Sequence, residues 1–449
     1  MKIDSGDTAW LLASSALVLF MTPGLAFFYG GMTRAKSVLN MLMMSFGAIG
    51  LVSVLWVLYG YSLSFGTDAF HGLIGNLDHI GMAKTLTGDG AISGTIPTTV
   101  FAAFQLMFAI ITVALISGAI ADRTKFGAWM LFAGVWATVV YFPVAHWVFF
   151  FDDTKDSAGN VIAHHGGWLG DRLGVLDFAG GTAVHVNAGA AGLALALVLG
   201  KRHGWPKERF KPHNLSLVLI GAGILWFGWF GFNAGSAVAA NNLSGIAFIN
   251  TQVATAAAML GWLIVEKVRD GHATTLGAAS GAVAGLVAIT PACASVNPLF
   301  AIILGALVGG ICAVAVGLKY KLGFDDSLDV VGVHLVGGAS GAILIGFFAT
   351  ATVTGGANGL FFGGGLTQLG KQTLAVVVVG LYSFILSWII GKVIDKTMGF
   401  RISAEDEVTG IDTTAHAESG YDFTSAGGSS GLIAAATAKP LASASAEKE

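Results

Sequence analysis

Long stretches without a charged residue limit most strongly what this chain can fold into. The run from Asn214 to Val265 contains no Asp, Glu, Lys or Arg, and similar runs fill most of the sequence. A helix needs about 20 apolar residues to cross a bilayer, and only helices and closed barrels satisfy their backbone groups in lipid. The whole chain is 11% charged, against about 25% in soluble domains. We therefore predict an all-α integral membrane protein.

The lengths of these runs predict eleven transmembrane helices. Asn214–Val265 is long enough for two helices around the polar turn 233–244, and Ala273–Leu318 for two that divide at Pro291–Pro298. The remaining runs, with one predicted helix each, are Thr8–Thr33, Ser37–Thr67, Gly90–Ala121, Phe126–Phe151, Phe178–Gly200, Val330–Gly370 and Gln372–Gly391.

The distribution of Lys and Arg predicts the orientation of the chain. Basic residues gather in alternate connections, including Lys201–Lys211 and the segment Lys392–Arg401, while the other connections carry few. Connections enriched in Lys and Arg are the cytoplasmic ones. We therefore predict a multi-pass protein of the cell membrane with its N-terminus outside and its C-terminus in the cytoplasm. Residues 1–400 form the membrane domain and residues 401–449 a cytoplasmic tail, whose last residues, about 25 of them, have the composition of a disordered segment.

One motif occurs twice, in the fifth and in the tenth predicted helix. DFAGGTAVHVNAG begins at Asp177 and DVVGVHLVGG begins at Asp329, and His185 and His334 hold the same place relative to the Gly and Ala residues that follow. Helices 1–5 and 6–10 are then two repeats, and because five is odd the second repeat is inverted. Transporters built from inverted repeats bind their substrate where the repeats meet. We therefore expect both histidines to line one pore near the middle of the membrane, with helix 11 packed outside.

The polar residues of these motifs have alternative interpretations. A single histidine in an apolar helix is more often a buried core residue than a ligand, but two at the same repeat position favour a shared site. Asp177 is expected to cap its helix and also to attract a cation from outside. Asp326 lies eight residues before His334, as Asp177 does before His185, and is expected to be a cap. Asp329 is placed at the internal mouth of the pore.

Aromatic residues follow the same helices but do not by themselves indicate a site. Phe104 and Phe108 are four residues apart and share one helix face. Trp229 and Phe232 end the sixth predicted helix on the external side, close to Ser236. Core packing is the usual role of such residues, whereas aromatic faces at an external opening can hold a small cation. The sequence pattern leaves both interpretations open.

These segments resemble the ammonium transporter family (Amt/Mep/Rh), and in particular its bacterial Amt members. The resemblance runs from about Thr8 to Phe423 and rests on ALVLFMTPGLAFFYGGMTRAKSVLNM in the first helix, WFGFNAGSA in the sixth, and the two histidine motifs. It implies a transporter and not an enzyme, with eleven helices and a homotrimer that has one pore in each subunit. The implied substrate is ammonium or ammonia, with methylammonium as its analogue.

The resemblance also implies roles for individual residues. Two histidines share a proton or hydrogen bond within a hydrophobic pore, two phenylalanines form a gate above them, and further residues recruit ammonium at an external vestibule. The corresponding positions are His185 and His334 for the histidines, Phe108 and Phe232 for the gate, and Asp177, Phe104, Phe149, Trp229 and Ser236 for the vestibule. Phe149 stands where many members have a tryptophan, unless Trp168, beyond the inserted loop 152–167, takes that place. Neither a cofactor nor a metal ion is implied.

The cytoplasmic tail carries a second part of the resemblance. Gly410–Phe423 is similar to the ordered tail of bacterial members, which crosses to a neighbouring subunit and supports docking of the signalling protein PII. A secondary ammonium-sensing role through this tail is therefore expected. The lipid bilayer is the other expected partner. Nucleic acid is not expected, because the net charge is only -3.

Ammonium and potassium are similar in size, so the expected mechanism separates them by chemistry. A bare ion entering an apolar pore meets a Born cost on the order of tens of kcal/mol, whereas ammonium can leave its proton behind and cross as ammonia. Two other functions compete with transport. A protein that is mainly an ammonium sensor would be favoured by a fused kinase or cyclase domain, which this sequence does not show. A gas channel of the Rh type is disfavoured by the Amt-like tail and first-helix motif. An enzyme is not expected, because the sequence shows no metal cluster, nucleophile–base motif or cofactor loop.

Overall fold

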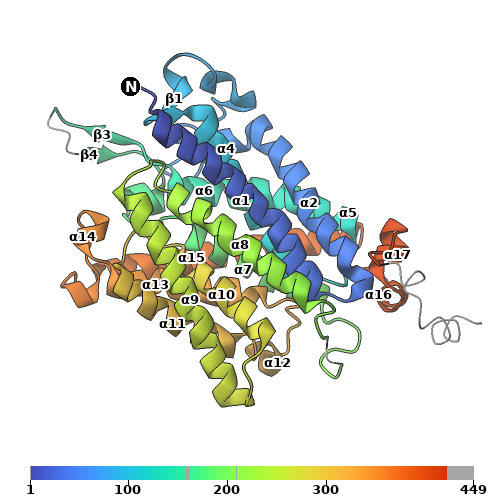
Figure 1. The fold of residues 1–449 in the computed structure, drawn as a ribbon. Helices are drawn as coiled ribbons and strands as arrows, with labels where there is room; N and C mark the ends of the chain where they lie inside the picture. The colour runs from blue at the N-terminus through green and yellow to red at the C-terminus, as the bar shows by residue number, and fades with distance from the viewer. Residues whose placement is uncertain (1, 158–160, 209, 422–449) are drawn as a thin grey trace, which may run out of the picture.

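The computed structural model describes residues 2–157, 161–208 and 210–421, which are mainly helical (Figure 1). Within these residues, ten helical segments are long and apolar enough to cross a membrane. Their elements are α1 Ser5–Met32; α2 Val38–Leu55 with η2 Trp56–Gly60 and α3 Tyr61–Phe65; α4 Thr98–Ile116; α5 Phe126–Trp136 with η6 Ala137–Tyr141 and α6 Phe142–Phe149; η8 Gly181–Val186 with α7 Asn187–Leu199; α8 Leu215–Gly235; α9 Asn242–Asp270; α11 Pro298–Ala315; η9 Val331–Leu335 with α13 Val336–Phe348; and α15 Thr367–Thr397.

Shorter elements join these segments. Two antiparallel strand pairs, β1 with β2 and β3 with β4, lie in loops. The bounds of the shorter elements are η1 Ala35–Ser37, η3 Ile80–Thr85, η4 Gly88–Ala91, β1 Ile92–Ser93, β2 Ile96–Pro97, η5 Ser117–Ile120, β3 Asp153–Lys155, β4 Val161–His164, η7 Trp168–Arg172, α10 Thr275–Ile289, α12 Leu318–Leu322, α14 Ala351–Thr354, η10 Leu360–Phe362, α16 Ala404–Thr409 and α17 Ile411–His416.

The eighth predicted helix differs from the others in length. It corresponds to α10, which has 15 residues and is therefore shorter than the ten apolar segments. Most of its residues are buried, and the turn that follows leads to the start of α11 at Pro298. Each of the other predicted helices overlaps one of the ten segments. The helical membrane fold is thus as expected, while the count of eleven crossings stays a prediction.

Polar residues end the apolar runs by capping the next helix. The Asn214 side chain accepts from the Leu217 amide at 2.9 Å at the start of α8. Asn241 caps α9 by accepting from the Leu243 and Ser244 amides. Asn297, followed by Pro298, caps α11 in the same way. An Asn cap satisfies amide groups that a new helix leaves unpaired. The two longest charge-free runs divide at Asn241 and Asn297, within the turns predicted.

Glycines let α1 and α8 approach each other closely, and these helices run side by side in Figure 1. A side chain at Gly221 or Gly31 would collide with the backbone of the facing helix or its start. A side chain at Gly24 or Gly228 would meet Ile224 or Met21, respectively. Small residues at helix contacts are the usual packing device in membranes. The first helices of the two predicted repeats therefore pack directly on each other.

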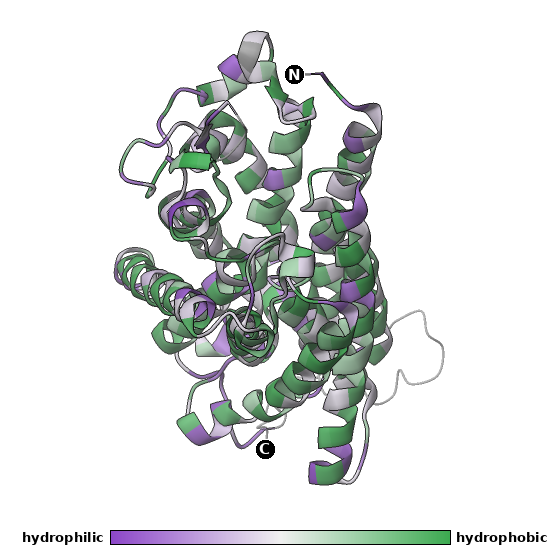
Figure 2. Ribbon diagram, turned by 90° about the vertical axis from the view of Figure 1, so that its left-hand side faces the viewer, coloured by the Kyte–Doolittle hydropathy of each residue, from purple (hydrophilic) through white to green (hydrophobic). Residues whose placement is uncertain are grey.

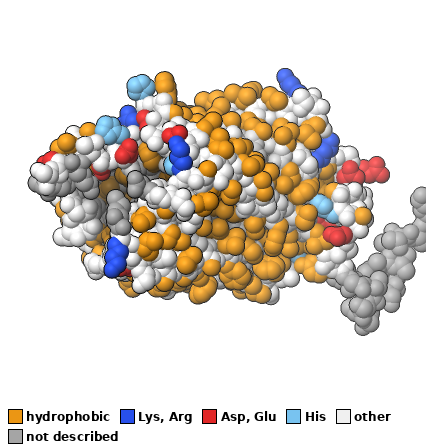
Figure 3. All heavy atoms as spheres, turned by 90° about the horizontal axis from the view of Figure 1, so that it is seen from above, with side chains coloured by type: hydrophobic (Ala, Val, Ile, Leu, Met, Phe, Trp, Pro, Cys, Tyr) orange, Lys and Arg blue, Asp and Glu red, His pale blue; other side chains and the backbone are white. Residues whose placement is uncertain are grey.

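The surface has an apolar middle and polar ends. Hydrophobic residues cover most of the helix lengths in Figure 2, and Figure 3 shows charged side chains gathered toward the two ends of one face. Exposed apolar side chains include Phe227, Ile264 and Leu381, each more than half exposed. The N-terminus and the β3–β4 hairpin lie at one end, and α12, α16 and α17 lie at the other (Figure 1). This surface suits a multi-pass membrane protein.

A buried network of charged side chains joins the connections at the α16–α17 end, and we call it the arginine network. It consists of Asp122, Arg123, Arg202 and Asp325, all 5% exposed or less. Arg202 donates two hydrogen bonds of 2.9 Å to the Asp325 carboxylate and one of 3.0 Å to Asp122. Burial opposes the charge on Arg202, but the hydrogen bonds to Asp325 and the Asp122 carboxylate raise the pKa of Arg202 above its ordinary value.

The described part of the tail folds against its own chain. The Asp412 carboxylate accepts from the Leu39 and Asn40 amides at 2.9 and 2.8 Å, at the start of α2. His416 Nε2 lies 3.0 Å from the Asn40 side-chain oxygen. The tail end is therefore attached to the first connection of the membrane domain. The segment predicted to be disordered lies outside the described residues.

Candidate functional site

Two matching half-helices form the frame of the site. The Asp177 carboxylate accepts from the amides of Gly180, Gly181 and Thr182 at 3.0, 2.5 and 2.8 Å. The Asp326 carboxylate accepts from the amides of Val330 and Val331 at 3.1 and 2.7 Å. Each aspartate therefore caps the segment that carries a histidine, as predicted. Both segments begin as π-helical turns, η8 and η9, a form that is often found at functional sites.

The two histidines face each other in the interior. His185 and His334 are 1% and 2% exposed, and their Nδ1 atoms lie 3.3 Å apart. A single proton between these nitrogens makes one the donor and the other the acceptor. His185 Nε2 is buried and has no hydrogen-bond partner among the described residues. This nitrogen can therefore offer a hydrogen bond to a small polar molecule.

A narrow apolar cavity lies beside the histidines. Its volume is about 10 Å³, close to the space that one water molecule needs. Besides His185 and His334, it is lined by Met21, Leu25, Ile111, Leu115, Val184, Leu225, Trp229, Phe232 and Val283. Apart from the imidazoles and the indole of Trp229, these side chains carry no polar atom except the thioether of Met21. The cavity is therefore a poor environment for a bare ion.

Two stacked phenylalanine rings lie between this cavity and a wider one, which we call the external cavity because the predicted orientation places it on the outside. The ring centroids of Phe108 and Phe232 lie 4.1 Å apart with an angle of 29° between the planes. Phe108 also lines the external cavity, while Phe232 lines the narrow one and lies 6.2 Å from the His185 ring. The pair predicted to be a gate thus stands between the two cavities.

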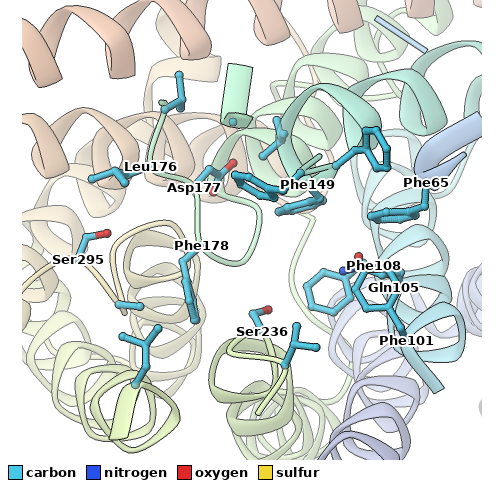
Figure 4. Close-up of a pocket in the computed structure, with 18 of the residues that line it drawn as sticks. Phe65, Phe101, Gln105, Phe108, Phe149, Leu176, Asp177, Phe178, Ser236 and Ser295 are labelled. Atoms are coloured by element: carbon cyan, nitrogen blue, oxygen red, sulfur yellow. The ribbon is translucent and has the colours of Figure 1, made fainter. Parts of the chain in front are cut away.

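The external cavity is wide and has a mixed polar and aromatic lining (Figure 4). Its volume is about 610 Å³. Asp177, Phe149 and Ser236 line it, as expected for the vestibule. The Asp177 side chain forms no ion pair with a basic residue within the described ranges. The side chain is 7% exposed and both carboxylate oxygens accept from amides of their own segment, so its charge attracts a cation in this cavity at a distance.

Two residues expected in the vestibule lie behind its wall. Phe104 is fully buried and packs on Phe108, with ring centroids 4.9 Å apart. Trp229 stacks on His185 at 5.4 Å and donates its indole N–H to the Thr290 hydroxyl at 2.8 Å. Neither residue lines the external cavity. Their expected part in recruiting ammonium stays a prediction.

Gln105 lines the vestibule and was not expected from the sequence. It comes from the same face of α4 as Phe101 and Phe108, and Figure 4 shows all three at the opening. Residues 101, 105 and 108 follow helical spacing as closely as 104 and 108 do. A polar residue on an otherwise apolar helix face was the signal that could have identified it.

Phe149, and not Trp168, occupies the aromatic position at the vestibule. Phe149 lines the cavity, and its ring lies 6.5 Å from the Phe108 ring. Trp168 packs on Trp147 at 5.8 Å and does not line the cavity. The inserted loop therefore does not supply the missing tryptophan.

A group of possible metal ligands lies in the inserted loop. His164 Nδ1 is 2.7 Å from the Asp153 carboxylate and 2.8 Å from the Asp171 carboxylate. The Asp171 hydrogen bond, with help from Asp153, raises the pKa of His164 above its ordinary value. A protonated imidazole satisfies both carboxylates, so we interpret the group as an ionic link that holds the β3–β4 hairpin.

Asp329 lies at the α12 end of the molecule, at the start of η9. Its carboxylate accepts a hydrogen bond from Lys319 Nζ at 2.6 Å. Both residues line a third cavity of about 410 Å³. This location suits the internal mouth that the sequence predicted.

The sequence matches a known family over nearly its whole length. The sequence model of the Ammonium Transporter Family matches residues 9–421. The chain belongs to the ammonium transporter family. An ammonium transporter of Mycobacterium bovis is 60% identical over 447 residues, covering 95% of this chain and 92% of that protein. An ammonium transporter of Bacillus subtilis is 45% identical, covering 93% of this chain and 98% of that protein.

Solved structures of ammonium transporters have the same fold. Mep2 from Candida albicans superposes with a TM-score of 0.79 at 35% identity, covering 90% of this chain and 88% of that one. A protein described as a Sensor Amt Protein superposes with a TM-score of 0.81 at 27% identity, covering 91% of this chain and 98% of that one. The predicted family is therefore confirmed. The relatives are transporters and not enzymes, also as predicted.

Proposed function

We propose that this member of the ammonium transporter family recruits ammonium at the external cavity and passes it inward as ammonia. The cation gives its proton to water in the external cavity, above the stacked rings of Phe108 and Phe232, and neutral ammonia then crosses the apolar cavity. The observation that carries the proposal is the pair of histidines, whose Nδ1 atoms lie 3.3 Å apart in a cavity with almost no other polar group.

The external cavity contains the groups that an ammonium ion needs. The Ser236 hydroxyl and the Gln105 side-chain oxygen can accept hydrogen bonds from its N–H groups, and Asp177 supplies a negative charge. The faces of Phe108 and Phe149 attract a cation through their π electrons. A phenylalanine attracts a cation less strongly than a tryptophan does, so Phe149 gives a weaker external site than tryptophan would.

Selectivity against potassium follows from the narrow cavity. A bare ion loses its hydration there and finds two imidazoles as its main polar neighbours. Ammonia has no net charge and can accept from or donate to His185 and His334 as it passes. Potassium has no neutral form, so it stays in the external cavity. The same pair of imidazoles can relay the released proton.

Methylammonium uptake tests this function. Vesicles that contain the purified protein should take up radiolabelled methylammonium in a saturable way, and ammonium should compete while a large excess of potassium should not. The uptake should be measured with and without a proton gradient, which reveals whether the proton crosses with the substrate. Uptake no faster than in protein-free vesicles would overturn the proposal.

The remaining parts of the proposed assembly are eleven crossings, an external N-terminus and a homotrimer with one pore per subunit. The count of eleven depends on whether α10 is also a crossing, because the other ten segments suffice in length. An odd number of crossings agrees with the N-terminus and the tail lying at opposite ends in Figure 1.

The tail is proposed to bind a PII-type signalling protein on the cytoplasmic side and to give a secondary sensing role. A purified PII-type protein should bind inverted membrane vesicles, which expose the cytoplasmic face, and not right-side-out vesicles. Deletion from Gly410 should abolish this binding, because it removes the segment anchored through Asp412. Deletion of Leu432–Glu449 is the matched control and should leave binding intact. Binding to right-side-out vesicles would mean that the orientation is opposite to the one proposed. Binding after the longer deletion would exclude the docking role.

A further inference from the structure

The two half-helices of the site differ at one equivalent position. Three residues after Asp177 the chain has Gly180, and three residues after Asp326 it has Asp329. Both residues adopt a left-handed backbone, with φ of 105° and 64°. Both carbonyl oxygens accept from the amide four residues later, at 2.8 and 2.9 Å. The backbone role is therefore the same in the two repeats.

Glycine suits this position better than aspartate does. A left-handed backbone is free of strain for glycine and unfavourable for residues with a Cβ, although aspartate tolerates it better than most. Asp329 thus occupies a position where the first repeat has the residue that fits the backbone. The left-handed backbone conformation therefore does not explain why this position carries a carboxylate.

Lys319 shows what this carboxylate binds. Its Nζ donates to the Asp329 carboxylate at 2.6 Å and to the Asp326 backbone carbonyl at 2.8 Å. The lysine is only 8% exposed. A lysine head group is an alkyl-substituted ammonium ion with three N–H donors. The carboxylate and the carbonyl therefore already hold an ammonium-type cation that is tethered to the chain.

Two carboxylates line this cavity, and Asp329 is the one that lies on the segment carrying His334. Arg269, Asp270 and Lys321 are the other charged residues in its lining. Arg269 and Asp270 neutralise each other in an ion pair of 2.7 Å. The Asp329 side chain is 33% exposed, so a free cation can reach it from the cavity. Asp329 also lies only five residues before His334 in the same segment.

We propose that the Asp329 carboxylate and the Asp326 carbonyl form an ammonium-binding site at the internal mouth, and that Lys319 competes for it. This inference rests on the proposed transport function. When ammonia leaves the apolar cavity and takes a proton from water at the internal mouth, the new ammonium ion binds Asp329 by displacing the Lys319 head group. The return of the lysine then releases the ion. Lys319 thereby sets how strongly the cytoplasmic face holds ammonium.

Two substitutions test the site, one that removes the carboxylate and one that removes its competitor. Asp329→Gly installs the residue that the first repeat carries at this backbone position, so it should fold. It should raise the half-saturation concentration of methylammonium from the cytoplasmic face by about tenfold, the effect of one charge-assisted hydrogen bond. Lys319→Met removes the competitor and should lower that concentration by about fivefold, a modest coupling between two ligands. A passive pore cannot favour one direction at equilibrium. The maximal uptake rate from the cytoplasmic face should therefore rise where the half-saturation concentration rises, and fall where it falls.

The measurement uses inverted vesicles for the cytoplasmic face and right-side-out vesicles for the external face. We expect both shifts in half-saturation only in the inverted vesicles, with the two variants moving in opposite directions. Equal values in wild type and Asp329→Gly, or equal shifts at both faces, would overturn the internal site and leave the transport function standing. Lack of methylammonium uptake by the wild type would instead overturn the transport function. If Lys319→Met does not fold, Asp329→Gly alone decides.

Discussion

Replacing His185 with aspartate should allow potassium through a pore that excludes it in the wild type. The substitution puts a fixed negative charge and additional water at the narrow cavity, and a paired charge avoids much of the desolvation penalty. We expect potassium flux to rise by about tenfold or more, since about 1.4 kcal/mol removed from a barrier speeds passage tenfold. His334→Asp should have the same effect more weakly. Potassium-dependent growth of a deficient host, or current in a planar bilayer, measures the change.

His185→Leu is the matched control for this prediction. It also removes the imidazole, but it keeps the cavity apolar, so it should not admit potassium. Oligomer size must be the same in both variants. Potassium flux through the leucine variant equal to that through the aspartate variant would show that the barrier is steric and not electrostatic.

Replacing Arg202 with methionine should strongly destabilise the protein. The side chain is 5% exposed and its guanidinium neutralises Asp122 and Asp325, which are 2% and 0% exposed. Both carboxyl groups have a pKa below the ordinary value despite burial, because Arg202 and neighbouring arginines hold them ionised. Removing one partner of a buried ionic network costs about 3–5 kcal/mol. The melting temperature in detergent should therefore fall by about 5 °C or more.

Lys211→Met is the control for the arginine network. Lys211 is an exposed basic residue of the same connection, so its replacement should change the stability by no more than about 0.5 kcal/mol. If Arg202→Met and Lys211→Met have the same melting temperature, the arginine network contributes nothing to the stability of the fold.

The sequence predicted the helices well because charge-free length is a direct signal of a membrane crossing. The split of Asn214–Val265 followed from its polar turn, and the Asn241 cap explains it. The same signal could not give the length of α10, because the apolar residues beyond Ile289 form a turn and not more helix. Nor could it give the π-helical turns at His185 and His334, since hydrogen-bond register leaves no mark in composition.

Within the site, the repeat predicted the features that the two halves share. It did not predict the directions in which individual side chains point. The equal offsets of Asp177 and Asp326 predicted both caps. Spacing alone could not say that Phe104 and Trp229 do not line the external cavity, because aromatic residues occur on every face of these helices. The sequence analysis used Arg202 only as one of the basic residues that indicate orientation, and it gave no sign that Arg202 is buried between two carboxylates.

The most direct test of the account compares ammonium and potassium in the wild-type protein. Purified protein in vesicles is given equal inward gradients of radiolabelled methylammonium and radiolabelled potassium, and the two uptake rates are measured side by side. If deprotonation determines selectivity, methylammonium enters and potassium enters no faster than in vesicles without protein. Equal entry of both would contradict the account, and His185 and His334 would then be buried core histidines.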